Sequence, residues 1–194
     1  MNVLGIMGSA RRDGNTNDLL DLVLRTAADE GATTQKIILA DYRVEHIGNC
    51  RDCKAAGRCV NADDDFGKLM DQVYAADVLI FGSPVYWYTV SGLMKVFLDR
   101  WSCCYYQDSY EAFVAKMKLK AGGVVTVQEE SGYEQASHLI GALEKTIRFG
   151  GGEYLGYVLG PGGKRGNALK SQAAVDAARL LGQKAAKFTP PSKG

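Results

Sequence analysis

Short apolar runs along this chain alternate with longer stretches in which apolar residues recur every three or four positions. The runs at residues 3–7, 36–40, 77–82, 122–127 and 154–159 predict five strands, and the run at 77–82 is typical of a fully buried strand. The stretches between them predict helices over about 15–30, 63–75, 92–101, 133–149 and 168–188. Strict alternation of strand and helix predicts a parallel sheet covered on both faces.

Five strands are too few for a closed (β/α)₈ barrel, so we expect an α/β fold with an open, doubly wound five-stranded parallel sheet and helices on both faces. Residues 1–189 should form a single domain, and residues 190–194 a flexible tail. Ligands of such sheets bind outside the C-terminal ends of the strands, where the strand order reverses. The loops at residues 8–17, 83–91 and 128–132 are therefore the candidate site.

The first of these loops, Gly8 to Asn17, joins a strand directly to a helix. A helix N-terminus offers unpaired N–H groups and a partial positive charge, which suit a phosphate. The loop has neither the Gly-Lys-Ser/Thr of a Walker loop nor the dinucleotide pattern Gly-x-Gly-x-x-Gly. An ordinary turn capped by Asn or Thr is the alternative. The candidate ligands are Ser9, Asn15, Thr16 and Asn17, with charge from Arg11 or Arg12.

The loop after the third strand brings three aromatic residues in a row to the same edge. A flat, apolar ligand would explain them, because aromatic walls pack against its faces while loop N–H groups meet its polar rim. The alternative is that some of these rings pack into the core or an oligomer interface. The residues in question are Pro84, Val85, Tyr86, Trp87 and Tyr88.

Composition narrows the class of protein further. The 194 residues are 46% hydrophobic and 23% charged, with a net charge of +1, so neither a nucleic acid nor a membrane surface is an expected partner. No apolar run is long enough to span a membrane, and the N-terminal stretch lacks the features of a signal peptide. Five cysteines, an odd number, argue against a disulfide framework and favour the reducing cytoplasm.

Two motifs now carry a resemblance. The stretch from Gly8 to Thr16, Gly-Ser-x-Arg-x-x-Gly-Asn-Thr, combined with residues 77–86 and 91–100, resembles the NADPH-dependent FMN reductase and iron–sulfur flavoprotein group of flavodoxin-like proteins, over nearly the whole chain. The resemblance implies a flavodoxin-like fold, FMN as cofactor and NAD(P)H as co-substrate. It implies that Ser9, Arg11, Asn15, Thr16 and Asn17 hold the FMN phosphate, that the isoalloxazine ring lies along Pro84, Val85, Tyr86, Trp87 and Tyr88, and that the loop from Gln128 to Gly132 closes the other side.

The implied activity is that of an FMN-dependent oxidoreductase. It would take hydride from NAD(P)H and pass it to a small acceptor, which could be a flavin, a quinone, a nitro or azo compound, or a metal ion. No catalytic side chain is assigned, because the cofactor carries the chemistry. Glu129 and Glu130 could repel a phosphate and weaken NADPH binding, but we expect them to face solvent. Relatives of this type form homodimers or homotetramers, and the aromatic segment 101–110 is the candidate interface.

Two other functions stay open. The first is an electron carrier of flavodoxin or iron–sulfur-flavoprotein type, served by a ferredoxin-like partner. Flavodoxins are strongly acidic, so a net charge of +1 favours the reductase. The second is a regulatory flavin-binding protein.

The cysteine loop at residues 49–61 is similar to the cluster-binding loop of iron–sulfur flavoproteins, which spaces four cysteines as C-x₂-C-x₂-C-x₅-C. Cys50, Cys53 and Cys59 match, but Ala56 stands at the third position. A four-iron cluster normally takes four thiolates. We favour no metal, with FMN as the sole stable redox centre. An iron–sulfur cluster completed by Cys103, Cys104 or a foreign ligand, a zinc site, or redox thiols are the alternatives.

Three further features are assigned structural roles. His46 and His138 are isolated in the sequence and are expected to be surface or packing residues. Asp99 and Arg100 are expected to form an ion pair at a helix end, or an interface contact.

Overall fold

The computed structural model describes residues 1–49, 53, 55, 61–107, 109–118, 120–129 and 132–190. Five strands form one sheet in which every pairing is parallel. They are β1 (Asn2–Met7), β2 (Thr33–Ile38), β3 (Val78–Pro84), β4 (Ala121–Gln128) and β5 (Glu153–Pro161). Their order, β2-β1-β3-β4-β5, is that of flavodoxin-like sheets, with the switch point between β1 and β3. The predicted fold class is confirmed.

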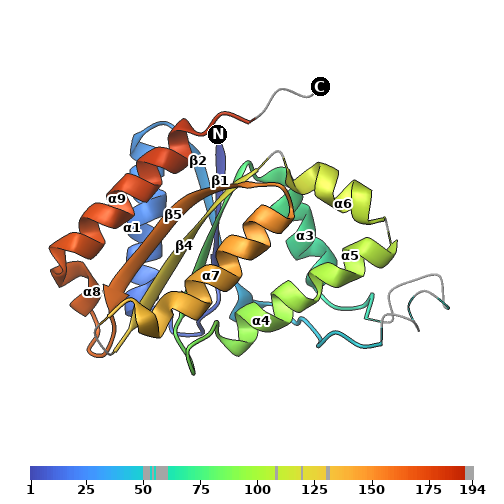
Figure 1. The fold of residues 1–194 in the computed structure, drawn as a ribbon, viewed down its shortest axis with the longest axis horizontal. Helices are drawn as coiled ribbons and strands as arrows, with labels where there is room; N and C mark the ends of the chain where they lie inside the picture. The colour runs from blue at the N-terminus through green and yellow to red at the C-terminus, as the bar shows by residue number, and fades with distance from the viewer. Residues whose placement is uncertain are drawn as a thin grey trace.

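Helices cover both faces of the sheet (Figure 1). One face carries α1 (Asn15–Asp29), α8 (Asn167–Lys170) and α9 (Gln172–Lys187), and α1 packs directly on α9. The other carries α3 (Phe66–Ala75), α4 (Gly92–Asp99), α5 (Trp101–Gln107), α6 (Tyr110–Met117) and α7 (Glu134–Phe149). A 3₁₀ turn, Leu39–Asp41, follows β2. None of the described helices is long and apolar enough to cross a membrane.

Each face buries its own hydrophobic core. The core beneath α1 and α9 includes Leu19, Leu20 and Val23, which recur at helical spacing. The core on the opposite face gathers Phe81, Phe97, Trp101 and Phe113, whose rings pack edge to face or tilted. The central strands β3 and β4 are buried along their whole length, as expected for a sheet that is covered on both sides.

The predicted elements differ from the observed ones in four main places. The helix expected from residue 63 begins at Phe66. The second strand begins at Thr33 rather than at residue 36, because β2 is an edge strand whose outward side chains are polar. The predicted helix 92–101 ends at Asp99, and α5 and α6 follow as separate helices. The predicted helix 168–188 is interrupted at Ser171, whose extended backbone lets its hydroxyl cap α9 by accepting from the N–H of Ala174.

The segment 101–110 was the candidate oligomer interface, and three of its side chains lie instead in the core of the chain, whereas those of residues 105–108 are not described. Trp101, Cys103 and Cys104 are buried in the core on the α7 face. Tyr110 is half exposed and packs against Phe149 with ring centroids 5.6 Å apart. The apolar pattern of Trp101, Cys103 and Cys104 therefore reflects packing in the core of the chain.

Asp99 and Arg100 do not pair with each other. Asp99 binds Lys95 one helical turn earlier, at 2.6 Å, on the surface. The Arg100 guanidinium turns inward to Asp64, and the two side chains are 1% and 2% exposed. The expected ion pair between the two neighbours was wrong because successive helix residues point in different directions.

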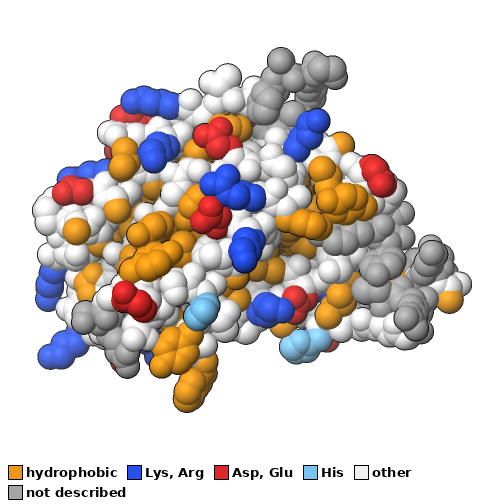
Figure 2. Space-filling view, in the orientation of Figure 1, with side chains coloured by type: hydrophobic (Ala, Val, Ile, Leu, Met, Phe, Trp, Pro, Cys, Tyr) orange, Lys and Arg blue, Asp and Glu red, His pale blue; other side chains and the backbone are white. Residues whose placement is uncertain are grey.

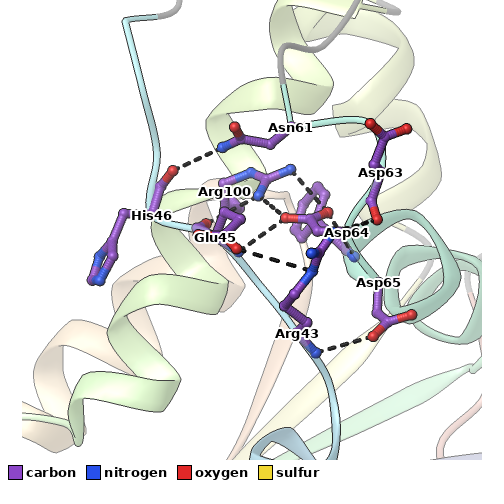
Figure 3. A network of polar contacts seen from close by, with 9 residues as sticks. Arg43, Glu45, His46, Asn61, Asp63, Asp64, Asp65 and Arg100 are labelled. Carbon is purple, nitrogen blue, oxygen red and sulfur yellow. Dashed lines mark hydrogen bonds and ion pairs between the residues drawn. The ribbon is translucent and has the colours of Figure 1, made fainter.

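Figure 3 shows that Asp64 and Arg100 lie at the centre of a polar network that ties two chain segments together. Asp64 accepts from the N–H groups of Glu45 (2.9 Å) and Phe66 (3.0 Å), and Arg100 also donates to the Glu45 carbonyl at 3.0 Å. A second set of bonds joins Arg43 to Asp65 and Asp63, and the Asn61 amide to the His46 carbonyl. We call this network the clasp. Residues 50–60 lie between the two segments that it joins.

The cysteine loop itself falls largely beyond what the structure describes. Cys50, Cys59 and Ala56 lie outside the described residues, whereas Cys53 is half-buried against the core on the α7 face. The part of the chain that is described contains no group of three or more His, Cys, Asp or Glu side chains arranged to hold a metal. The alternatives for this loop stay predictions.

Candidate active site

A cleft of about 540 Å³ opens at the C-terminal ends of β1, β3, β4 and β5. It lies at the switch point, where the sequence placed the site. All of the residues predicted for the site line it except Arg12, which pairs with Asp41, and Asn17 and Gly132. The lining residues are Ser9, Arg11, Gly14, Asn15, Thr16, Pro84, Val85, Tyr86, Trp87, Tyr88, Val127, Gln128, Glu129, Gln135, Gly162 and Gly163.

The first and third loops are fastened to each other at the base of the cleft. Met7 pairs with Gly82 in the sheet, and the Gly8 N–H donates to the Gly82 carbonyl at 2.7 Å. The Ser91 hydroxyl donates to the Gly8 carbonyl, and the Ser91 N–H donates to the Ser83 hydroxyl at 2.9 Å. A Cβ at Gly8 would lie 2.9 Å from the Met94 Cβ, so only glycine permits this approach. The two loops are therefore held in one geometry.

One end of the cleft is the N-terminus of α1. Gly14 precedes the helix and supplies no side-chain cap, and the first intrahelical bond runs from the Asp18 N–H to the Gly14 carbonyl at 3.0 Å. The N–H groups of the first turn are thus available to an anion. Ser9 and Thr16 bring hydroxyls to the same wall and are at most 7% exposed. This end suits a phosphate.

Asn15 and Asn17 make contacts that their sequence did not reveal. The Asn15 amide donates to the Lys164 carbonyl at 3.0 Å and accepts from the Ala168 N–H at 3.2 Å, so it fastens the loop after β5 to the cleft wall. Asn17 turns away from the cleft: it donates to Asp21 and accepts from Lys36.

The other end of the cleft is a tight aromatic turn. Tyr86 and Thr89 exchange two backbone hydrogen bonds, of 3.0 and 3.1 Å, across Trp87 and Tyr88. Both central residues have positive φ, 49° and 65°, in a turn that normally takes Asn and Gly there. Trp87 is 92% exposed and its two neighbours about half. Figure 2 shows hydrophobic side chains protruding at the lower edge, where Figure 1 places this turn. Backbone strain of this kind is characteristic of binding sites.

The loops after β4 and β5 complete the wall. Gln128 is nine-tenths buried, and its amide nitrogen donates to the carbonyl of Gly132, which itself lies off the cleft. Gly162 and Gly163 face the site from the β5 side, which sequence reasoning missed. The signal was available in the sequence, because Gly160-Pro161-Gly162-Gly163 directly follows the strand predicted at 154–159. Gln135, from the first turn of α7, is the other residue that was missed.

Charges around the cleft are mixed. Arg11 stands on the wall at the phosphate end, and Glu129, which is exposed, stands on the opposite side. Glu130 lies outside the described residues. Arg165 bridges to Asp13 at 2.8 Å across the loops after β5 and β1. Burial raises the pKa of Asp18, and the nearby Arg165 partly opposes that rise.

These features together fit a flat ring that carries a phosphate. The uncapped helix end and the buried hydroxyls suit the phosphate, and the aromatic turn suits the ring. A sheet of this order with a cleft at its switch point is the arrangement in which flavodoxin binds FMN.

Residues 1–149 match the model of the NADPH-dependent FMN reductase family, and the chain belongs to this family of oxidoreductases. It is 32% identical, over 93% of this chain and 96% of the relative, to YwqN of Bacillus subtilis, which is named for NAD(P)H-dependent, FMN-containing oxidoreductase activity. It is also 32% identical to the iron–sulfur flavoprotein MJ1083 of Methanocaldococcus jannaschii, over 96% of both chains. The comparisons confirm three predictions: the family, the class of oxidoreductase, and the use of FMN with NAD(P)H.

A solved structure supports the fold over the same range. The Trp repressor binding protein of Bacillus subtilis superposes with a TM-score of 0.69 at 26% identity, covering 96% of this chain and 99% of that one.

Proposed function

We propose that FMN occupies this cleft and that the protein reduces a small acceptor with electrons from NAD(P)H. The acceptor classes are free flavin, quinones, nitro or azo compounds, and metal ions. The observation that supports the proposal is the combination, in one cleft, of an uncapped helix end and an aromatic turn whose rings stay half or more exposed. Because this side of the cleft is exposed, NAD(P)H could reach the ring first and the electron acceptor afterwards.

In this proposal the residues of the chain bind FMN and orient its ring. The N–H groups at the start of α1 and the hydroxyls of Ser9 and Thr16 would hold the phosphate, with Arg11 adding charge. Tyr86, Trp87 and Tyr88 would flank the ring. FMN, when bound, supplies the redox chemistry by taking two electrons from NAD(P)H and releasing them to the acceptor. We assign no protein acid or base.

The test is an anaerobic titration of the FMN-loaded protein. Stoichiometric bleaching by NADH or NADPH, followed by reoxidation with a quinone, would support the reductase. No bleaching by either nucleotide would overturn it.

An electron carrier is the second candidate, because an iron–sulfur flavoprotein is among the relatives. Reduction by a reduced ferredoxin but by neither nucleotide would favour the carrier. Iron and acid-labile sulfide analysis of the purified protein tests the accompanying proposal that FMN is its sole redox centre.

We also propose that the protein acts in the cytoplasm as a homodimer or homotetramer. Exposed aromatic residues flank α7 on two sides: Tyr110 with Phe149, and Tyr133 with Tyr157 at a centroid distance of 5.7 Å. Figure 2 shows hydrophobic patches on both sides of the charged surface of α7. Light scattering after size-exclusion chromatography tests this, and a strictly monomeric mass would contradict it.

A further inference from the structure

The loop after β5, residues 162–166, presents its backbone to the cleft. It lies beyond residues 1–149, the part of the chain that matches the family. Gly162 and Gly163 line the cleft, and because neither has a side chain, only their backbone atoms can meet a ligand there. A Cβ at Gly162 would lie 3.1 Å from the carbonyl carbon and oxygen of Gln128, so glycine permits this close approach to the end of β4. We call residues 162–166 the β5 loop.

The β5 loop is attached to the cleft walls on two sides. On the β4 side, the Gly162 N–H donates to the Gln128 carbonyl at 2.6 Å. On the α1 side, Asn15 Nδ2 donates to the Lys164 carbonyl at 3.0 Å. Asn15 Oδ1 accepts at 3.2 Å from the N–H of Ala168, in the helix α8 that directly follows the loop. The part of the loop that lines the cleft is therefore held from both sides.

Asn15 is the side chain that joins this loop to the helix at the phosphate end. It is the first residue of α1 and is 6% exposed. The reverse orientation of its amide would set oxygen against the Lys164 carbonyl and nitrogen against the Ala168 N–H, so the two partners fix the amide in one orientation. These bonds indicate a role for Asn15 other than the phosphate contact that the sequence motif implied.

The position of the β5 loop narrows the part of FMN that it would meet. In the proposed placement, the phosphate lies at the N-terminus of α1 and the ring lies along the aromatic turn, so the ribityl chain crosses the cleft between them. The loop is attached at the start of α1 and at the end of β4, and it borders this middle part of the cleft. Ribityl hydroxyls donate and accept hydrogen bonds, and backbone N–H and C=O groups suit both.

We propose that the β5 loop binds the ribityl chain of FMN through the backbone of Gly162 and Gly163, and that Asn15 is a positioning residue that holds this loop ready. The inference rests on the proposed placement of FMN in this cleft. A loop that is already in place when the ligand arrives does not have to be ordered on binding, so Asn15 strengthens binding without touching the cofactor.

Three flavins that share the same ring separate the possible roles of Asn15. FMN carries the ribityl chain and the phosphate, riboflavin lacks the phosphate, and lumiflavin lacks both. Asn15→Leu removes the bonds to Lys164 and Ala168. In this variant we expect FMN and riboflavin each to bind about tenfold more weakly, as fluorescence quenching measures it, and lumiflavin to bind as it does to the wild type.

Ser171→Ala is the matched control. It removes the corresponding bond of the next helix, in which the Ser171 hydroxyl accepts from the Ala174 N–H at 3.4 Å, and Ser171 does not line the cleft. All three flavins should bind this variant with the affinity of the wild type.

Two other patterns in Asn15→Leu would overturn the proposal. A loss of affinity for FMN alone would assign Asn15 to the phosphate, and an equal loss for all three flavins would show a general effect on the fold. If the wild type fails to bind FMN, the proposed function fails. If it binds FMN and Asn15→Leu binds every flavin as tightly, this inference alone fails.

A measurement on the wild type covers the case in which the variant does not fold. In ¹H–¹⁵N spectra of ¹⁵N-labelled protein, the backbone amide signals of Gly162 and Gly163 should differ in position between the complexes with riboflavin and with lumiflavin. The same positions in both complexes would contradict the proposal.

Discussion

Asp64 and Arg100 show how individual side chains can stay charged in the interior. Burial alone would raise the pKa of the Asp64 carboxyl, but hydrogen bonds from Arg100 and from the N–H groups of Glu45 and Phe66 outweigh it and hold that pKa below its usual range. Burial would likewise lower the pKa of Arg100, and the bond to Asp64 reverses that effect. Both groups are therefore ionised at neutral pH, and each depends on the other.

Asp64→Asn should lower the free energy of unfolding by about 3–5 kcal/mol, because it leaves the Arg100 charge buried without its partner. Urea denaturation of the variant and the wild type measures this. Asp99→Asn is the matched control: it breaks the exposed pair with Lys95, which contributes at most about 1 kcal/mol. Equal losses in the two variants would show that burial of the pair is energetically unimportant.

The same carboxyl should make stability depend on pH in acid. Its pKa is lower in the folded than in the unfolded chain, so its contribution is complete above the unfolded value of about 3.9 and is lost as the pH falls through the folded value. The difference in unfolding free energy between wild type and Asp64→Asn should be constant from about pH 5 to 7 and shrink below about pH 4. A difference that stays constant through the acid range would contradict this.

The aromatic turn is the clearest strained element. Positive φ costs a bulky residue about 1–2 kcal/mol, so Trp87→Asn with Tyr88→Gly, the pair that such turns prefer, should stabilise the protein by about 1–3 kcal/mol in urea while weakening FMN binding. Trp87→Ala with Tyr88→Ala removes the same rings but keeps the strain. It should weaken FMN binding equally without the gain in stability, and equal stability of the two double variants would refute the strain.

The start of α4 links helix capping to the site. Ser91→Ala removes the cap on the Met94 N–H and the bond to the Gly8 carbonyl, so we expect a loss of about 2–4 kcal/mol in urea and weaker FMN binding. Ser109→Ala removes the corresponding cap of α6, on the Ala112 N–H, far from the cleft along the chain. That control should lose about 1 kcal/mol and bind FMN as the wild type does. Unchanged FMN affinity in Ser91→Ala would show that the hydrogen bond from Ser91 to the Gly8 carbonyl does not contribute to the FMN site.

The sequence pattern located the elements with a clear hydrophobic signature and missed the short helices that lack one. The central strands β3 and β4 each contain a continuous apolar run, and α1 repeats its apolar residues every three or four positions, so all three could be predicted. The helices α5 and α6 could not, because they are short and their boundary is set by the Ser109 cap rather than by a change in hydrophobic pattern. The break at Ser171 is equally a matter of a single cap.

For the whole molecule, FMN should stabilise the fold because it binds only the folded chain. At one hundred times its dissociation constant, we expect a gain of about 2.7 kcal/mol, which for a chain of this size raises the melting temperature by about 5–10 °C. Riboflavin at the same concentration lacks the phosphate and should raise it less, since it cannot use the N-terminus of α1. Equal shifts for the two ligands would contradict the phosphate site.

The site could be predicted where sequence neighbours act together and not where distant segments meet. Ser9 and Thr16 lie close together in the sequence at the start of α1, and Tyr86 to Tyr88 lie in one turn. Their roles at the phosphate end and at the ring end of the cleft could therefore be predicted from the sequence. Gly162 joins them only because β5 lies beside β4 in the sheet. The pairing of Arg100 with Asp64 spans 36 positions and needs the folded arrangement of both segments.

The clasp has a consequence for how this fold can vary. The hydrogen bonds and the ion pair described for it join residues 43–46, 61–66 and Arg100, so they tie together the two ends of residues 50–60. The ends of that stretch are therefore anchored whatever it contains, and extra length would cost little loop-closure entropy. In evolutionary terms, the stretch is an exchangeable insert between two fixed ends. A lineage could gain or lose the ligands of a metal centre there, one cysteine at a time, without changing the contacts that form the clasp.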